Sequence, residues 1–240
     1  MTFTGFGAEA SGFLAALAQD NSRAFFDAHR SQYERVIRQP MEDLLGEAEA
    51  TYGSGRVMRP NRDVRFSTDK SPYRTDAGLW AGSVGGVYLS LTAEHLEVGG
   101  GLYEPSRDQL ARARTAIDSA PTAAARLAQI VATLVAEGFE MAGPSLRTAP
   151  RGYDREHPHI ELLRLKHYAA LTTLPVDAAP EEIRHSWETV EPLIEWAGTF
   201  VGAAQSWPQL VWHCAKREAS RQALTATPSA GPPPPRSLVS

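Results

Sequence analysis

The sequence predicts an α+β fold, in which a small antiparallel sheet is packed with several helices. Apolar residues recur at helical spacing over the first fifty residues, extended segments follow between residues 57 and 103, and helical spacing returns after Ser106. The chain has 240 residues, enough to bury a sizeable core without disulfides or metals. We therefore expect a single domain over residues 1–215.

The N-terminal region is predicted to be helical. A first helix runs from Ala8 to Ala18 with Ser11 as its cap, and a second begins at Asn21 or Ser22. A third runs from Gln32 to Tyr52, and Pro40 should kink or restart it because proline has no backbone N–H to donate.

The middle of the chain is predicted to form the sheet. Val57 to Ser67 is expected to be extended, and Val84–Thr92 and His95–Tyr103 form a hairpin with a short turn between them. Three consecutive glycines, Gly99 to Gly101, lie in the second strand of this hairpin. Such a run indicates a bulge or a close approach of another part of the chain.

The C-terminal half is predicted to return to helices. Helices are expected to follow Ser106 and Pro121, and a further helix has Pro158 in its first turn. A strand over Tyr168–Leu174 precedes a last helix from Pro180 to about Ala204. Residues 216–240 are rich in proline and are expected to be a disordered tail.

Composition excludes several classes of protein. The formal net charge of −4 argues against a uniformly basic surface for nucleic acid, and no apolar run reaches the length of a membrane-spanning helix. The first residues lack the basic stretch of a signal peptide, which favours a cytoplasmic location. Cys214 is the only cysteine, so an internal disulfide is excluded and we assign this thiol no role. The chain contains no nucleotide-binding or hydrolase motif that would identify a cofactor or a reaction.

Positive charge is concentrated in two segments. Residues 56–76, the first basic segment, carry six arginines or lysines against three aspartates, and residues 147–167, the second basic segment, carry five against three acidic residues. Arginine binds carboxylate and phosphate groups through two parallel hydrogen bonds. We expect the two segments to converge on one pocket for a small anion. In the alternative interpretation, the arginines form ion pairs with nearby aspartates and only stabilise the fold.

Specific side chains follow from this hypothesis. The anion would be held by Arg59, Arg62, Arg65 and Arg147, with Tyr153 completing the ligand-binding set. Asp63 is expected to orient Arg65, and Asp69 to orient Lys70 or an arginine. If the protein is an enzyme, the candidates for proton transfer are Lys70, Tyr73, His157 and Lys166. Arg62 is expected to lie beside Val64 and Phe66 on one face of an extended segment, where its charge would need a partner.

Other interpretations use the same residues differently. A binding module without chemistry would recognise nucleic acid or a protein through the basic residues, with Tyr73, Tyr103 and Tyr153 as candidates for base stacking. His157 is expected to cap a helix whose N-terminus binds the anion. Together with His159 and His167 it invites a metal site, but their spacing is not that of a metal motif and we expect none. Tryptophans Trp187, Trp196, Trp207 and Trp212 would supply a partner interface if the arginines are only structural.

The first basic segment resembles the signature of a bacterial family, the domain of unknown function 2461. The resemblance rests on Arg59-x-x-Arg62-Asp63-x-Arg65-Phe66 and on Asp69-Lys70-x-Pro72-Tyr73. It extends over most of residues 10–200, through the blocks Phe13-Leu14, Asn21–Phe26, Tyr33-Glu34, Pro40, Gly101–Tyr103 and Pro150–Pro158. Phe26 and Arg74 depart from the family pattern, which has a tryptophan-phenylalanine pair and often a lysine there, and His159 is not part of it. The resemblance implies one α+β domain and highlights the same two segments, but it implies no activity.

Overall fold

The computed structural model describes residues 2–63, 65 and 68–204, and these residues contain a six-stranded antiparallel sheet. The strand order is β1-β2-β3-β4-β6-β5, so β1 and β5 form opposite edges. The strands are β1 (Gly55–Val57), β2 (Ala77–Gly82), β3 (Gly86–Leu91), β4 (Leu96–Leu102), β5 (Glu140–Met141) and β6 (Tyr168–Leu174). The predicted α+β class, the hairpin and the strand Tyr168–Leu174 are confirmed. The hairpin turn closes through a hydrogen bond from the N–H of Thr92 to the carbonyl of His95.

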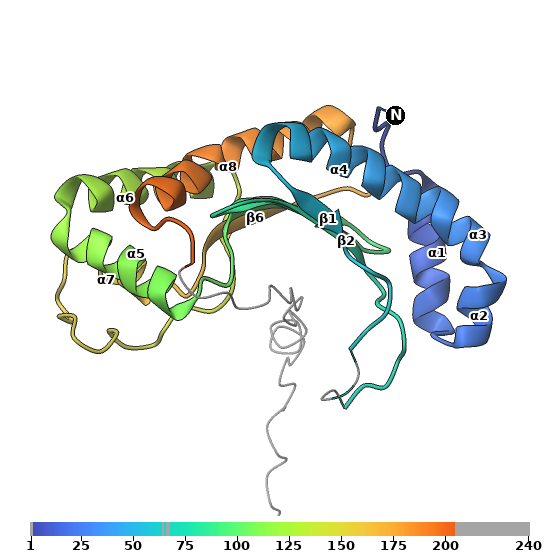
Figure 1. The fold of residues 1–240 in the computed structure, drawn as a ribbon, viewed down its shortest axis with the longest axis horizontal. Coiled ribbons are helices and arrows are strands. Elements are labelled where there is room, and N and C mark those ends of the chain that lie inside the picture. The colour runs from blue at the N-terminus through green and yellow to red at the C-terminus, as the bar shows by residue number, and fades with distance from the viewer. Residues whose placement is uncertain (1, 64, 66–67, 205–240) are drawn as a thin grey trace, which may run out of the picture. The chain divides into compact units, whose positions relative to one another are not determined.

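The helices lie on one face of the sheet and at its two ends (Figure 1). Helices α4 and α8 cross the same face, α1 to α3 lie at the end near β1 and β2, and α5 to α7 lie at the other end. The helices are α1 (Ala8–Gln19), α2 (Arg23–Ala28), α3 (Arg30–Tyr33), the π-helical turn η1 (Glu34–Arg38), α4 (Gln39–Tyr52), α5 (Arg107–Ser119), α6 (Pro121–Ala136), α7 (Ile160–Arg164) and α8 (Pro180–Phe200).

Two hydrophobic clusters make up the core, and α8 contributes to both. Ile183 and Trp187, in its first half, pack with the N-terminal helices and the strands β2 to β4. Leu193 and Trp196, in its second half, pack with α5, α6, α7 and β6. The indole N–H groups of Trp187 and Trp196 donate to the carbonyls of Tyr88 and Ala123, so neither buried ring leaves its donor unsatisfied. These two tryptophans are core residues, so the predicted partner interface is wrong for them; Trp207 and Trp212 lie outside the described residues.

The glycine run in β4 lets α8 approach the sheet closely. A Cβ atom on Gly100 would lie 3.0 Å from Cγ2 of Val190 in α8 and 2.5 Å from the carbonyl oxygen of Gly86. The strand pairs in continuous register with both neighbours across Gly99 to Gly101, so the run serves a close approach and not a bulge. Only a residue without a side chain fits at this contact.

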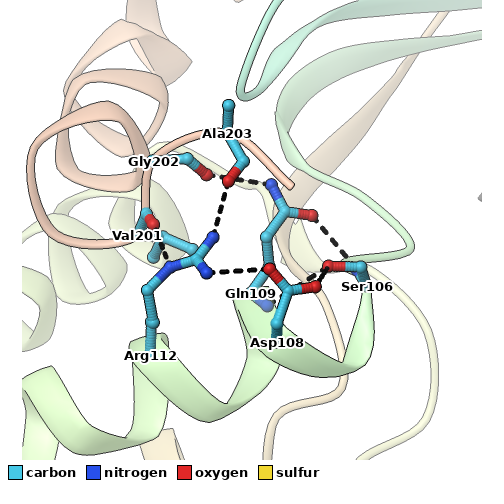
Figure 2. Close-up of polar contacts among 7 residues, drawn as sticks. All are labelled: Ser106, Asp108, Gln109, Arg112, Val201, Gly202 and Ala203. Carbon is cyan, nitrogen blue, oxygen red and sulfur yellow. Dashed lines mark hydrogen bonds and ion pairs between the residues drawn. The ribbon is translucent and has the colours of Figure 1, made fainter. Parts of the chain in front are cut away.

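Polar side chains of α5 fasten the end of α8 (Figure 2). Arg112 donates to the carbonyls of Val201 and Ala203, and Gln109 donates to the carbonyl of Gly202 at 3.0 Å. These carbonyls follow the last turn of α8 and have no partner within that helix. Ser106 and Gln109 also form the capping box that begins α5, as the sequence predicts for Ser106. The first turns of α5 therefore cap their own helix and also hydrogen-bond the C-terminal end of α8.

Several predicted boundaries are wrong at the level of single residues. Helix α1 begins after Gly7, and the hydroxyl of Ser11 donates to the carbonyl of Ala8, so Ser11 is not its cap. The expected helix over Gln32–Tyr52 is interrupted by η1, because Pro40 has no N–H to donate to the carbonyl of Val36. The last helix ends at Phe200. Of the expected extended segment Val57–Ser67, Val57 ends β1 and Asn61 forms an isolated bridge, while residues 64, 66 and 67 lie outside the described residues.

Some predictions fall outside the described residues. They are the disordered tail over 216–240, the boundary at residue 215, and the thiol of Cys214. Within the described residues, no helix combines the length and the apolar character that crossing a membrane requires.

We predict that Gly100→Ala destabilises the protein, because the new methyl group would overlap the backbone of β3 and the side chain of Val190. The free energy of unfolding should fall by about 1–3 kcal/mol, as for other overpacked cores. Urea denaturation followed by circular dichroism measures it. Gly198→Ala is the matched control, because a Cβ there meets no atom within 4 Å and alanine favours a helix. Equal stability of the two variants would contradict the close approach.

Candidate anion-binding site

The first basic segment is a loop between β1 and β2 whose base is fixed by the N-terminal helices. Asn61 and Tyr73 form a β-bridge, and the side-chain amide of Asn21 pairs with both backbone groups of Tyr73, at 2.9 and 3.0 Å. The ring of Tyr73 is buried and stacks on Phe26 with 4.1 Å between ring centroids. Tyr73 is thus an anchor in the core, and its role in proton transfer stays a prediction.

The tip of this loop is exposed, and its arginines are held by its own aspartates. Arg65 donates to both carboxylate oxygens of Asp63, and Arg62 forms an ion pair with Asp69, so the two predicted pairings are present. Hydrogen bonds from the hydroxyl and the N–H of Ser71, and then the charge of Arg62, lower the pKa of Asp69 to about 2. The side chains of Arg62 and Arg65 are 40% and 77% exposed. Val64 and Phe66, beside which Arg62 is expected to lie, fall outside the described residues. Arg59 and Lys70 are exposed as well.

The second basic segment, between β5 and β6, contains a cavity. The cavity has a volume of about 340 Å³ and is lined by Thr148, Ala149, Arg155, Ile160, Glu161 and Arg164. Arg155, Glu161 and Thr148 are exposed residues, so the cavity opens to the surface. The lining of this space, which is large enough for a small molecule, therefore includes two arginines, one glutamate and one threonine.

Arg164, at the end of α7, is held firmly on the cavity wall. Its Nη1 donates to Glu161 at 2.8 Å and its Nη2 donates to the carbonyl of Arg147. Its Nε is buried and has no hydrogen-bond partner among the described residues. The side chain is only 28% exposed, so this guanidinium is partly removed from water. A buried N–H without a partner is unfavourable.

Contacts from elsewhere in the fold keep α7 in place. Leu162 and Leu163 are buried in the second hydrophobic cluster. Arg114 of α5 donates to the carbonyls of Leu163 and Leu165, at 3.1 and 3.5 Å, at the C-terminal end of α7. Packing and hydrogen bonds from distant parts of the chain thus hold the short helix, so the position of Arg164 is set by tertiary structure.

The loop that leads to α7 is a series of tight turns. The N–H of Tyr153 donates to the carbonyl of Pro150, and the N–H of Glu156 donates to the carboxylate of Asp154 at 2.9 Å. His157 accepts from the N–H of His159 through Nδ1, so its proton is on Nε2, which lies 3.7 Å from Asp118. His157 thus shapes the loop that carries Arg155.

The helix after this loop differs from the prediction. It begins at Ile160, with His159 as its N-cap and Pro158 outside its first turn, so His157 is not the cap. The helix ends at Arg164, and Leu165 is its C-cap. A helix of five residues has too small a dipole to serve as the anion site expected at its N-terminus.

The structure does not bring the two basic segments together. The first flanks β1 and β2 and the second flanks β5 and β6, and these pairs are separated by β3 and β4 (Figure 1). The predicted site made of both segments is therefore wrong. None of the predicted site residues of the second segment lines the cavity. The carbonyl of Arg147 accepts from Arg164, Tyr153 is half-buried against the second cluster, and Lys166 is exposed.

Sequence reasoning missed the residues that line the cavity. In the sequence, Arg155 and Arg164 contributed only to the net positive charge of the second basic segment. No binding role was predicted for Thr148 or Glu161. One local signal was present, because Arg164 interrupts the apolar run Leu162-Leu163-Arg164-Leu165. A charge within such a run must lie at the boundary of the core and needs a partner there.

His167 has a structural role next to the site. Its Nδ1 accepts from the N–H of Glu104 at 3.0 Å, and its ring stacks on Tyr103. Burial, and then the charge of Lys166, lower the pKa of His167. Within the described residues, no three side chains of histidine, cysteine, aspartate or glutamate are grouped to hold a metal ion.

Comparison with known proteins identifies a family to which the chain is similar. A family model described as "Conserved hypothetical protein (DUF2461)" matches residues 9–196 of the chain. The searches of curated proteins and of solved structures gave no match.

We predict that the protein loses stability as the pH falls below the ordinary pKa of histidine, in part through His167. In the folded state this imidazole is kept neutral, because its Nδ1 accepts from the N–H of Glu104. The unfolded chain therefore binds a proton at this histidine more readily, and the free energy of unfolding falls as the pH decreases. Urea denaturation at pH 7.5 and 5.5 measures the effect. His167→Asn retains an acceptor near the Nδ1 position but does not titrate, and should show a smaller loss between the two pH values. An unchanged pH dependence in this variant would rule out His167 as a source.

Proposed function

The chain belongs to the DUF2461 family, and we propose that it binds a small anionic ligand, bearing a carboxylate or a phosphate, in the cavity beside Arg164. The family match confirms the resemblance seen in the sequence. We include a cytoplasmic location in the proposal, since a chain with one cysteine forms no internal disulfide, as is usual in that compartment.

The observation that supports the proposal is the guanidinium of Arg164. It belongs to the lining of a cavity of about 340 Å³, and two of its nitrogens are already fixed by hydrogen bonds to Glu161 and to the carbonyl of Arg147. The fixed planar group is preorganised, so little side-chain entropy is lost when a ligand binds. Arg155 supplies a second positive charge on the same cavity. Thr148 offers a hydroxyl that can donate to an anionic oxygen.

A nucleic-acid-binding module has less support. Base stacking needs accessible aromatic rings next to basic residues. Of the three tyrosines considered from the sequence, Tyr73 is buried, Tyr103 stacks on His167 and Tyr153 packs against the second hydrophobic cluster. The arginines at the tip of the first segment are paired with aspartates of the same loop, which favours local stabilisation of that loop.

We predict that small anions protect the full-length protein against thermal unfolding and that Arg155→Ala weakens this protection. Inorganic phosphate, acetate, 2-hydroxy acids and α-amino acids are titrated separately while the midpoint of unfolding is recorded. A ligand at a hundred times its Kd adds about 2.7 kcal/mol, a rise of roughly 5–10 °C for a chain of this size. Losing a hydrogen bond to a charged group should raise Kd about 10-fold or more in Arg155→Ala.

Arg151→Ala is the matched control for this experiment. It removes the same charge from the same loop, but Arg151 is exposed and does not line the cavity. It should bind as the unmodified protein does. If no anion raises the midpoint, or if the two arginine variants lose affinity equally, the cavity is not the binding site.

A further inference from the structure

Glu161 gives the cavity a negative group beside its positive ones. Its carboxylate lies 2.8 Å from Nη1 of Arg164, and both residues line the cavity with Arg155. The charged residues of the lining are thus two arginines and one glutamate, and the glutamate is paired with Arg164. The carboxylate that helps to fix Arg164 also repels a simple anion bound beside it, because like charges repel.

We propose that the ligand is a small zwitterion, an α-amino acid with an aliphatic side chain. This inference rests on the proposed anion-binding function and specifies its ligand. The ligand carboxylate accepts from the guanidinium groups of Arg164 and Arg155, and its ammonium group donates to Glu161. A positive group on the ligand converts the repulsion from Glu161 into attraction, which a phosphate or a simple carboxylate cannot do.

The remaining lining and the size of the cavity define the rest of the ligand. Ala149 and Ile160 are apolar and provide a surface against which a short aliphatic side chain can pack. A volume of about 340 Å³ is near the lower end of the range for small-molecule sites. It suits a single amino acid and is small for a nucleotide or a peptide.

The position of Glu161 has a second explanation, which the experiment must distinguish. Glu161 and Arg164 are three residues apart on α7, and such pairs also form on helices that bind nothing. The side chain of Glu161 is 76% exposed, so removing its charge should leave the fold intact. Glu161→Gln therefore tests the role in binding without destroying the site.

The test compares each amino acid with the acid that lacks its amine. Titration calorimetry on the full-length protein uses L-alanine, L-valine and L-leucine, their 2-hydroxy acid counterparts, and inorganic phosphate. We expect the best amino acid to bind about 10-fold or more tightly than its hydroxy acid, the size of one hydrogen bond to a charged group. In Glu161→Gln this preference should shrink to within about 3-fold. Glu156→Gln, which changes an exposed carboxylate in the same loop outside the cavity, should retain it.

Each other result has a distinct meaning. If a hydroxy acid or phosphate binds at least as tightly as every amino acid, the zwitterion proposal is overturned and anion binding stands. If Glu161→Gln keeps the full preference for the amine, Glu161 is only a helix surface pair and the proposal is again overturned. If no probe binds, the proposed function fails with it.

Discussion

The contact between α8 and the glycine run of β4 is the constraint on which the rest of the fold depends. Helix α8 contributes residues to both hydrophobic clusters, and it passes close to the sheet where Val190 meets Gly100. A side chain at Gly100 would lift the helix from the strands and loosen both clusters together. The carbonyls beyond its last turn are held by α5, so its C-terminal end is secured by hydrogen bonds as well as by packing.

The cavity depends on the same set of contacts, because α5 holds both α8 and the helix that carries Arg164. Helix α5 contacts the end of α8 through Arg112 and the end of α7 through Arg114, so it fixes the main helix of the core and the short helix that carries Arg164. A loop of tight turns then places Arg155 on the same cavity. A binding site needs side chains whose positions are set before the ligand arrives, and here rigid neighbours provide that order.

Local features of the fold were predictable because their causes lie within a few residues of each other. Ser22 and Ser106 accept from backbone N–H groups three residues ahead, the hairpin turn is closed by Thr92 and His95, and the strand Tyr168–Leu174 has the predicted ends. The failures have local causes of a different kind. The turn η1 depends on how the carbonyl freed by Pro40 is accommodated, and the start of α7 depends on the turns set by Asp154 and His157.

By itself, the sequence determined the fold class, the family and the two segments that concentrate positive charge, because these follow from spacing, motif and composition. Only the tertiary structure decided which charges share a site. It buried Tyr73 against Phe26, kept the first segment away from the second, and brought Arg155, Glu161 and Arg164 to one cavity. The physical reason is that a side chain's exposure and partners are set by distant contacts, such as those of Arg114 and Asn21, which the order of residues does not reveal.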